Sequence, residues 1–191
     1  MKKKNVVIFA SGKGSNALNI IRHFSLSHDI QVSLIVSNRE KAGVLDVALE
    51  NNIETLLAKK EQLNDSDFHN RLIEKGADLI VLAGFLLKIP KAFISAFKGK
   101  IINIHPSLLP KYGGKGMYGD HVHKAVLENQ DQETGITVHW VNEEYDEGLI
   151  IEQLSCSVAN ATSVQEIREE VQKIEKVAFP LIIKKILSNE L

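Results

Sequence analysis

An asparagine and a histidine two residues apart are the side chains in this sequence best suited to acyl-transfer chemistry. Asn103 and His105 end an apolar run, and two prolines follow in Pro-Ser-Leu-Leu-Pro. Because side chains alternate along a strand, Asn103 and His105 point to one side and Ile104 to the other. An amide donor and a ring that titrates near neutrality suit a carbonyl oxygen that becomes an oxyanion. A hydrogen-bonded polar pair without a catalytic role is the alternative.

A glycine loop at residues 11–16 is the second candidate, as an anion site. It lies between an apolar run and an amphipathic stretch, and its backbone N–H groups and the helix dipole favour a phosphate. The loop fits the dinucleotide pattern G-x-G-x-x-A and lacks the Walker A spacing. After the next strand the chain has Arg39 in place of an acidic residue for the ribose of NAD, so an NADP-dependent oxidoreductase stays open. A tight turn without a ligand stays open as well.

Alternating apolar strands and amphipathic helices must position these groups. They predict an α/β fold, a doubly wound, mostly parallel sheet with helices on both faces. The expected strands are 5–10, 31–37, 53–57, 78–83, 100–104, 137–141 and 149–158. The expected helices are one after the glycine loop, 44–49, 67–75, which Gly76 closes, a short one from Pro90, and 121–129. A long C-terminal helix is expected to begin at a capping box, 163–166, and to kink at Pro180. Ligands of such sheets bind at the carboxyl ends of the strands.

Composition excludes several other classes of function. The 191 residues have a net charge of -1, so we expect no general attraction to nucleic acid or membranes. No apolar stretch approaches the roughly 20 residues of a membrane span. Cys156 is the only cysteine, which rules out an intrachain disulfide and fits a reducing, cytoplasmic location. We expect one domain over residues 1–191 and interpret the Lys2–Lys4 run as a solvated end.

A metal site is not expected. His105, His121, His123 and His139 are spread over two strands and a helix start, and no further metal signature accompanies them.

The octapeptide NIHPSLLP at 103–110 resembles the signature of folate-dependent formyltransferases. Supporting segments follow in the same order: SGKGSN at 11–16, LAGF at 82–85, GITVH at 135–139, DEG at 146–148, and Glu175 ahead of Phe179 and Pro180. The resemblance implies a Rossmann-like formyltransferase fold, 10-formyltetrahydrofolate as co-substrate, no metal, small-molecule partners only, and a monomer or homodimer. The members that fit best formylate the amine of a glycinamide ribotide in purine synthesis. Another folate-dependent formyltransferase, a formyltetrahydrofolate hydrolase and a non-catalytic binder are the alternatives.

The same resemblance assigns the site residues. It implies Asn103, His105 and Asp146 as the catalytic set. For the folate it implies Leu86, Leu87, Lys88, Ile89, Asn103, Asn142, Glu143, Glu144, Tyr145 and Asp146. For the ribotide it implies Gly12, Lys13, Gly14, Ser15, Asn16, Pro106, Gln172, Lys173, Ile174 and Glu175. The N-terminal half, about 1–100, then holds the phosphate, and the C-terminal half, about 101–191, holds the catalytic groups and the folate.

Three features depart from the family pattern. Leu87 stands where many relatives have a basic residue, and 64–66 lacks an arginine that many of them carry. Lys88, Lys59 or Lys60 are the cations that would compensate. The glycine-rich loop at 112–120 is longer than in many relatives, which indicates a mobile flap or a tolerated insertion.

Overall fold

The computed structural model describes residues 2–190. Their strands form one mixed sheet, which α-helices cover. The strand order is β3-β2-β1-β4-β5-β6-β7, which confirms the α/β, mostly parallel sheet that the sequence predicts. The strands are β1 Lys4–Phe9, β2 Ile30–Ser37, β3 Glu54–Leu57, β4 Ala77–Leu82, β5 Ile101–His105, β6 Glu133–Trp140 and β7 Ile150–Ser157. Strand β7 runs antiparallel to β6.

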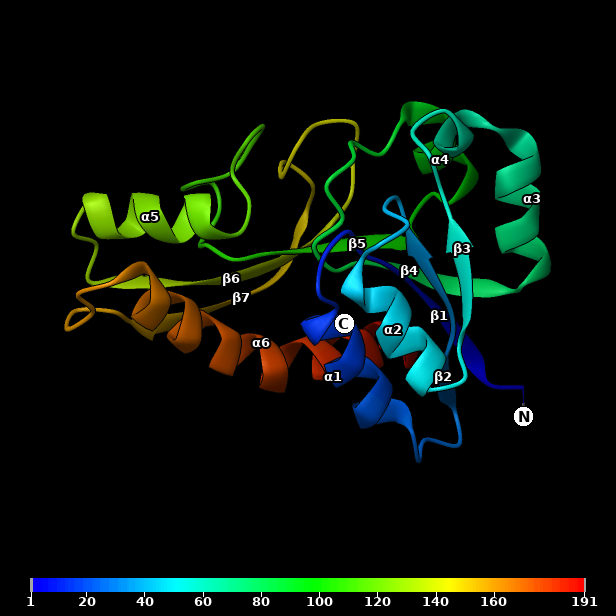
Figure 1. Ribbon diagram of the computed structural model, residues 1–191, viewed down its shortest axis with the longest axis horizontal. Helices are drawn as coiled ribbons and strands as arrows, with labels where there is room; N and C mark the ends of the chain where they lie inside the picture. Colours follow the sequence, from blue (N-terminus) through cyan, green and yellow to red (C-terminus); the bar gives the residue numbers. More distant parts are fainter. Residues whose placement is uncertain (1, 191) are drawn as a thin grey trace. The chain divides into compact units, whose positions relative to one another are not determined.

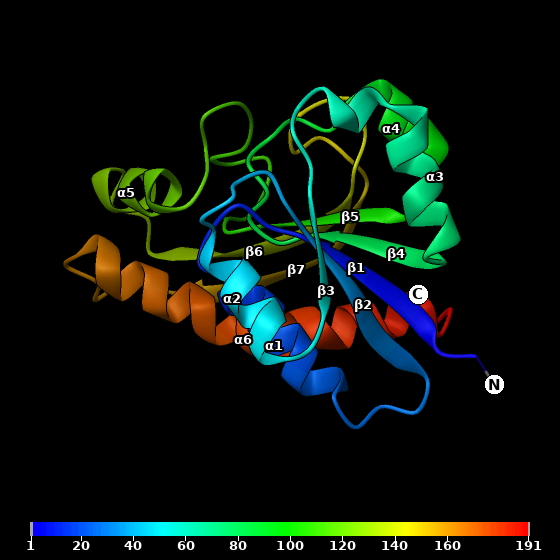
Figure 2. The same cartoon turned by 45° about the vertical axis from the view of Figure 1, so that its right-hand side comes forward.

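Residues 2–102 and 183–190 form a first compact unit. Its central strand is β1, which pairs in parallel with both β2 and β4 and in which Val6 to Phe9 have no exposed surface. The helices of this unit are α1 Ser15–Phe24, α2 Gly43–Glu50, α3 Ser66–Glu74 and α4 Lys91–Ala96, with a 3-10 turn η1 at Gln62–Asn64. Helices α1 and α2 lie on one side of these strands, and α3 and α4 lie on the other (Figures 1 and 2). This is the doubly wound arrangement.

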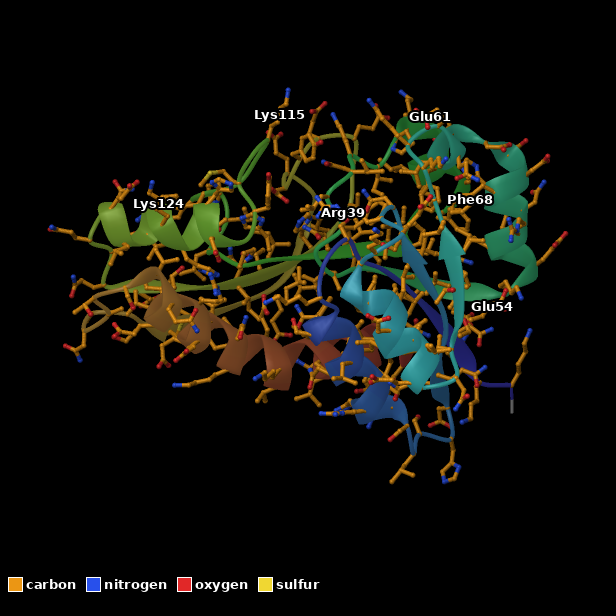
Figure 3. The ribbon with its side chains drawn as sticks, in the orientation of Figure 1. Arg39, Glu54, Glu61, Phe68, Lys115 and Lys124 are labelled. Carbon is orange, nitrogen blue, oxygen red and sulfur yellow. The ribbon has the colours of Figure 1, made fainter. Side chains whose placement is uncertain are left out.

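Residues 103–182 form a second compact unit. It holds the β6–β7 pair, helix α5 (Asp120–Glu128) and most of α6 (Val164–Leu187). Val126 of α5 and Ile167 of α6 pack in one apolar cluster with Val158. An ion pair between Asp120 and Arg168 also joins the two helices. Polar side chains such as that of Lys124 point outward from α5 (Figure 3). No helix within residues 2–190 is both long and apolar enough to cross a membrane.

The structure differs from the sequence prediction at several element ends. Strand β6 begins at Glu133, four residues before the expected start, because Gly135 interrupts the apolar pattern but pairs with Ser155 of β7. A Cβ on Gly135 would collide with the carbonyl oxygen of Leu154, so the glycine allows the close pairing. Helix α3 ends as predicted before Gly76, which adopts a φ of 69°.

The capping box before α6 is half confirmed. The Ser163 hydroxyl accepts from the Glu166 N–H at 3.3 Å, as predicted, whereas the Glu166 carboxylate accepts at 2.6 Å from the Thr162 N–H, one residue before the predicted donor. Helix α6 continues through Pro180 to Leu187 without a break, and the kink expected there stays a prediction.

Candidate active site

Three side chains of the second unit, those of Asn103, His105 and Asp146, come together at the carboxyl end of strand β5. Thr137 of β6 holds the exit of this strand, because its hydroxyl donates to the Ser107 carbonyl at 2.7 Å and accepts from the Leu109 N–H at 3.0 Å. The Gln153 amide of β7 adds hydrogen bonds of 2.9 Å to that hydroxyl and 2.8 Å to the Leu109 carbonyl. Three strands therefore fix the backbone that presents Asn103 and His105.

His105 lies between two acceptors. Its Nε2 is 2.7 Å from the carbonyl oxygen of Tyr112, and its Nδ1 is 3.5 Å from Asp146 Oδ2. Because a carbonyl only accepts, Nε2 carries the proton and donates it to Tyr112. The histidine side chain is 5% exposed and the aspartate side chain 12%, so solvent screens the pair weakly. A second proton on Nδ1 would be paired with the carboxylate at once.

Asp146 is held by an unusual backbone conformation and by two donors. Its φ of 57° lies in the left-handed region, which aspartate tolerates better than most residues. Its Oδ2 accepts the Gly114 N–H at 2.9 Å, and its Oδ1 is 3.4 Å from the Asn103 amide nitrogen. Two residues on, a Cβ on Gly148 would collide with the Trp140 carbonyl oxygen. The turn therefore requires the glycine, and it aims the carboxylate at β5.

His139 of β6 orients the Asn103 amide. Nδ2 of Asn103 lies 3.1 Å from His139 Nε2, and because an amide nitrogen only donates, Nε2 accepts. The proton of the His139 ring is then on Nδ1, which donates to the Trp140 carbonyl at 2.9 Å. Both hydrogens of the Asn103 amide are thus directed, one at His139 and one at Asp146.

The titration of the pair follows from burial and charge. Burial lowers the pKa of His105, and the Asp146 carboxylate and the Tyr112 carbonyl oppose this shift without outweighing it. Burial also acts to raise the pKa of Asp146, but its surroundings, which include the charge of His105 and the Gly114 N–H, outweigh burial, and that pKa is lowered. Around neutral pH the site holds a carboxylate beside a histidine whose second nitrogen can take up a proton. A group of this kind can act as a general base.

The glycine loop of the first unit forms a tight strand-to-helix turn. Gly14 has a φ of 82°, and a Cβ there would lie 2.8 Å from Val44 Cα. The Ser11 hydroxyl donates to Asn38 Oδ1 at 2.5 Å and accepts the Leu86 N–H at 2.9 Å, which ties the loop to two neighbouring segments. The N-cap residue of α1 is Gly14, which has no side chain that could accept the first N–H groups of the helix. The first turn of α1 therefore has the form of an anion site.

The remaining predicted binding residues lie on both units. In the first unit, Leu86 is 37% exposed, whereas Ile89 is 5% exposed and its side chain belongs to the core. In the second unit, residues 142–145 form an exposed turn in which the Asn142 side chain accepts the Glu144 N–H at 3.0 Å and donates to the Glu147 carbonyl at 3.2 Å. Pro106 follows β5, and 172–175 lie in the middle of α6. Their roles stay predictions.

The histidines that the sequence offers as candidate metal ligands lie in different surroundings. Within residues 2–190 no three His, Cys, Asp or Glu side chains converge in a way that would hold a metal ion. His123 instead lies in the core of the second unit, 4% exposed, and its Nδ1 has no hydrogen-bond partner. Burial lowers the pKa of His123 to about 4, and the charge of Arg168 acts in the same direction.

Comparison with known proteins decides the family. The family described as formyl transferase matches residues 4–183.

The chain belongs to the formyl transferase family.

Two named relatives of this formyl transferase carry the same enzyme name. It is 40% identical over 177 residues to the chloroplastic phosphoribosylglycinamide formyltransferase of Arabidopsis thaliana, covering 89% of this chain and 61% of the relative. It is 36% identical to phosphoribosylglycinamide formyltransferase of Escherichia coli (strain K12), covering 94% of this chain and 85% of the relative. The chain thus spans about three fifths of the plant relative's length.

A solved structure shows the same fold. The phosphoribosylglycinamide formyltransferase of Anaplasma phagocytophilum superposes on this formyl transferase with a TM-score of 0.88 at 31% identity, covering 98% of this chain and 89% of that one.

Sequence reasoning missed three parts of the site. From the sequence, His139 is a possible metal ligand and the end of the GITVH segment, but not a partner of Asn103, and the Tyr112 carbonyl and the Gly114 N–H belong to a loop interpreted as a flap or an insertion. The alternation of β6 was the available signal for His139, because it places Thr137 and His139 on one side of the strand. Nothing in the side-chain types marks the two backbone groups.

Proposed function

We propose that this protein transfers the formyl group of 10-formyltetrahydrofolate to the primary amine of phosphoribosylglycinamide, a step of purine biosynthesis. The observation that carries the proposal is one carboxylate, Asp146, in contact with both Asn103 and His105. The family membership and the names of the relatives support the same activity.

The transfer requires a stabilised oxyanion and a route for one proton. The amine nitrogen bonds to the formyl carbon, and the formyl oxygen takes the electron pair of the C=O bond. The bond from that carbon to N10 of the folate then breaks, and the proton that leaves the amine ends on N10. The Asn103 amide and the His105 N–H donate to the oxyanion, His105 carries the proton, and Asp146 stabilises the protonated ring.

The donors must first release their present acceptors. The Tyr112 carbonyl oxygen, 2.7 Å from His105 Nε2, is the same kind of acceptor as a formyl oxygen and takes the position that the substrate needs. On Asn103 the contact with Asp146 is the longer one, at 3.4 Å, and is the one that the substrate would replace. Displacement of the 112–114 backbone is therefore part of the proposed cycle. Figure 3 shows Lys115 of the same loop pointing outward.

Binding of the two substrates is part of the proposal. The Gly12–Asn16 loop, Pro106 and Gln172–Glu175 would bind the ribotide, and Leu86–Ile89, Asn103 and 142–146 would bind the folate. Small molecules would be the only partners of a monomer or homodimer. A cytoplasmic location is proposed because a single cysteine fits a reducing compartment.

The test is to mix the protein with both substrates and to follow release of free tetrahydrofolate by absorbance. We expect turnover that depends on phosphoribosylglycinamide. Substitution His105→Ala should nearly abolish turnover, whereas the matched control His28→Ala, at an exposed loop position, should keep it. Equal folate release with and without the ribotide would show a hydrolase and overturn the proposal.

A further inference from the structure

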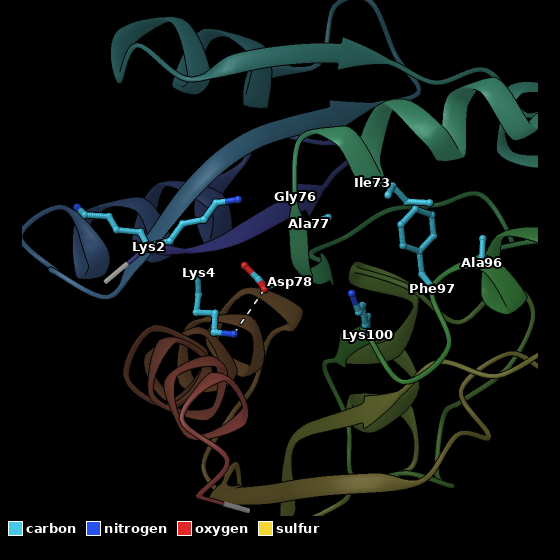
Figure 4. Close-up of a pocket in the computed structure, with 10 residues that line it drawn as sticks. Lys2, Lys4, Ile73, Gly76, Ala77, Asp78, Ala96, Phe97 and Lys100 are labelled. Atoms are coloured by element: carbon cyan, nitrogen blue, oxygen red, sulfur yellow. Dashed lines mark ion pairs between the residues drawn. The ribbon is translucent and has the colours of Figure 1, made fainter.

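A pocket of about 440 Å³ lies in the first unit at the amino ends of strands β1 and β4, the end opposite to the glycine loop of that unit (Figure 4). Its volume is within the range of small-molecule sites. The lining residues are Lys2, Lys3, Lys4, Ile73, Gly76, Ala77, Asp78, Ala96, Phe97 and Lys100. None of them belongs to the proposed formyl-transfer machinery.

The lining is strongly positive. Four lysines face one carboxylate, that of Asp78, which leaves three net charges. Asp78 is already engaged, because it accepts the Asn5 N–H at 2.8 Å and lies 3.6 Å from Lys4 Nζ. Lys3 donates to the Ser27 carbonyl at 2.8 Å. The charges of Lys2 and Lys100 face no second carboxylate in this lining.

The neighbouring helix ends account for only part of this charge. Helices α3 and α4 end beside the pocket, and each C-terminus carries roughly half a negative charge. About two positive charges therefore remain. The end of α3 is also capped already, because the Asn5 side-chain amide donates to the Lys75 carbonyl at 3.0 Å and to the Gly76 carbonyl at 3.3 Å. The lysines are more numerous than the fold itself requires.

The pocket also has an apolar side. Figure 4 shows Ile73 and Phe97 on one side of it and Lys4 with Asp78 on the other. Ile73 is 55% exposed, so a ligand in the pocket can contact its side chain. The cations come from two separate segments of the chain, 2–4 and Lys100. Cations from two segments favour a small ligand that carries several linked negative groups.

We propose that this pocket binds linked phosphates, as a nucleoside triphosphate or as inorganic polyphosphate. The phosphates contact the ammonium groups of Lys2, Lys4 and Lys100, and a nucleoside, where present, lies along Ile73 and Phe97. The site is separate from the ribotide phosphate site proposed at the Gly12–Asn16 loop.

Calorimetric titration of the full-length protein with ATP and with tripolyphosphate, in 0.15 M NaCl, tests the proposal. We expect saturable 1:1 binding that the double variant Lys2→Gln/Lys100→Gln weakens at least about tenfold, because hydrogen bonds to charged groups are lost. The control Lys98→Gln removes an exposed lysine two residues from Lys100 and should leave the affinity unchanged. Tighter binding of ATP than of tripolyphosphate would identify the nucleoside form, and equal binding the inorganic one.

Amide shifts in NMR spectra locate the ligand independently of affinity. Binding at the pocket should shift Gly76, Ala77 and Asp78 in both titrations. Absence of saturable binding, equal weakening by Lys98→Gln, or shifts confined to 12–16 would each overturn the proposal. The double variant should keep formyl transfer and the melting temperature of the wild type, because its two side chains are exposed.

Discussion

Replacing Asp146 by Asn tests whether the carboxylate acts through His105. The substitution keeps the shape and an oxygen that can accept the Gly114 N–H, but it removes the charge 3.5 Å from His105 Nδ1. At an effective dielectric constant of about 20, Coulomb's law gives about 5 kcal/mol for a charge pair at this separation. Because the two side chains are 5% and 12% exposed, solvent reduces this value little.

Only part of that energy will appear in the rate, because the amide dipole of Asn replaces some of it. We expect kcat for Asp146→Asn to fall about 100- to 1000-fold, since 1.36 kcal/mol corresponds to about a factor of ten. The carboxylate opposes the burial that lowers the pKa of His105, so its loss lowers this pKa further. The limb of the kcat–pH profile that reports a neutral His105 should therefore move to lower pH.

The assay is the steady-state release of free folate between pH 5 and pH 9, with circular dichroism to confirm folding. The matched control is Asp29→Asn at an exposed position, which should leave both kcat and the pH profile unchanged. A loss below tenfold for Asp146→Asn, with an unshifted acid limb, would show that the carboxylate does not stabilise the protonated ring.

Four further predictions follow from other contacts. His105→Ala should lower kcat at least about 100-fold while the circular dichroism spectrum stays native, because one oxyanion donor is lost. Tyr112→Phe removes the phenol's 2.7 Å hydrogen bond and so loosens the loop over the site, which should raise kcat/KM up to about fivefold in steady-state assays. Gly14→Ala should lower the free energy of unfolding by at least about 2 kcal/mol in urea titrations, because Gly14 has a positive φ and packs closely against Val44. The control Gly12→Ala should change this free energy by less than about 0.5 kcal/mol, because a Cβ on Gly12 would meet no atom within 4 Å. His123 has a pKa of about 4 in the folded protein, so the unfolded chain binds more protons as the pH falls from about 6.5 to about 4. Stability should drop by up to about 3 kcal/mol over this interval, and His123→Leu should remove most of the drop.

The fold could be predicted because its signals are local. A continuous apolar run marks a strand covered on both faces, and residues 6–9 of β1 are indeed completely buried. The signal failed where a glycine replaced an apolar residue, as at Gly135, because only the partner strand shows why a glycine is needed there. The Glu166 carboxylate shows the same limit at the start of α6. It accepts the N–H of Thr162, one residue before the Ser163 N–H that the capping box predicts.

The site could be predicted only in part because its contacts are long-range. Strand alternation places Asn103 and His105 on one side, and the structure agrees. Without the family resemblance, Asp146 is one carboxylate in a run of acidic residues, since its left-handed backbone is invisible in the sequence. The contribution of Gly114 is a main-chain N–H, a donor that every residue type except proline carries, so the residue type does not reveal it.

The turn that carries Asp146 separates fixed positions from variable ones. Two residues at the end of this turn leave almost no room for replacement. Asp146 has a left-handed φ, and a side chain on Gly148 would collide with the Trp140 carbonyl. The three residues between Asn142 and Asp146 are exposed, and none of them has a left-handed φ. Under the proposed function, mutant libraries confined to these three positions would probe donor specificity while the Asp146 carboxylate keeps its place, which makes this short segment a starting point for redesign.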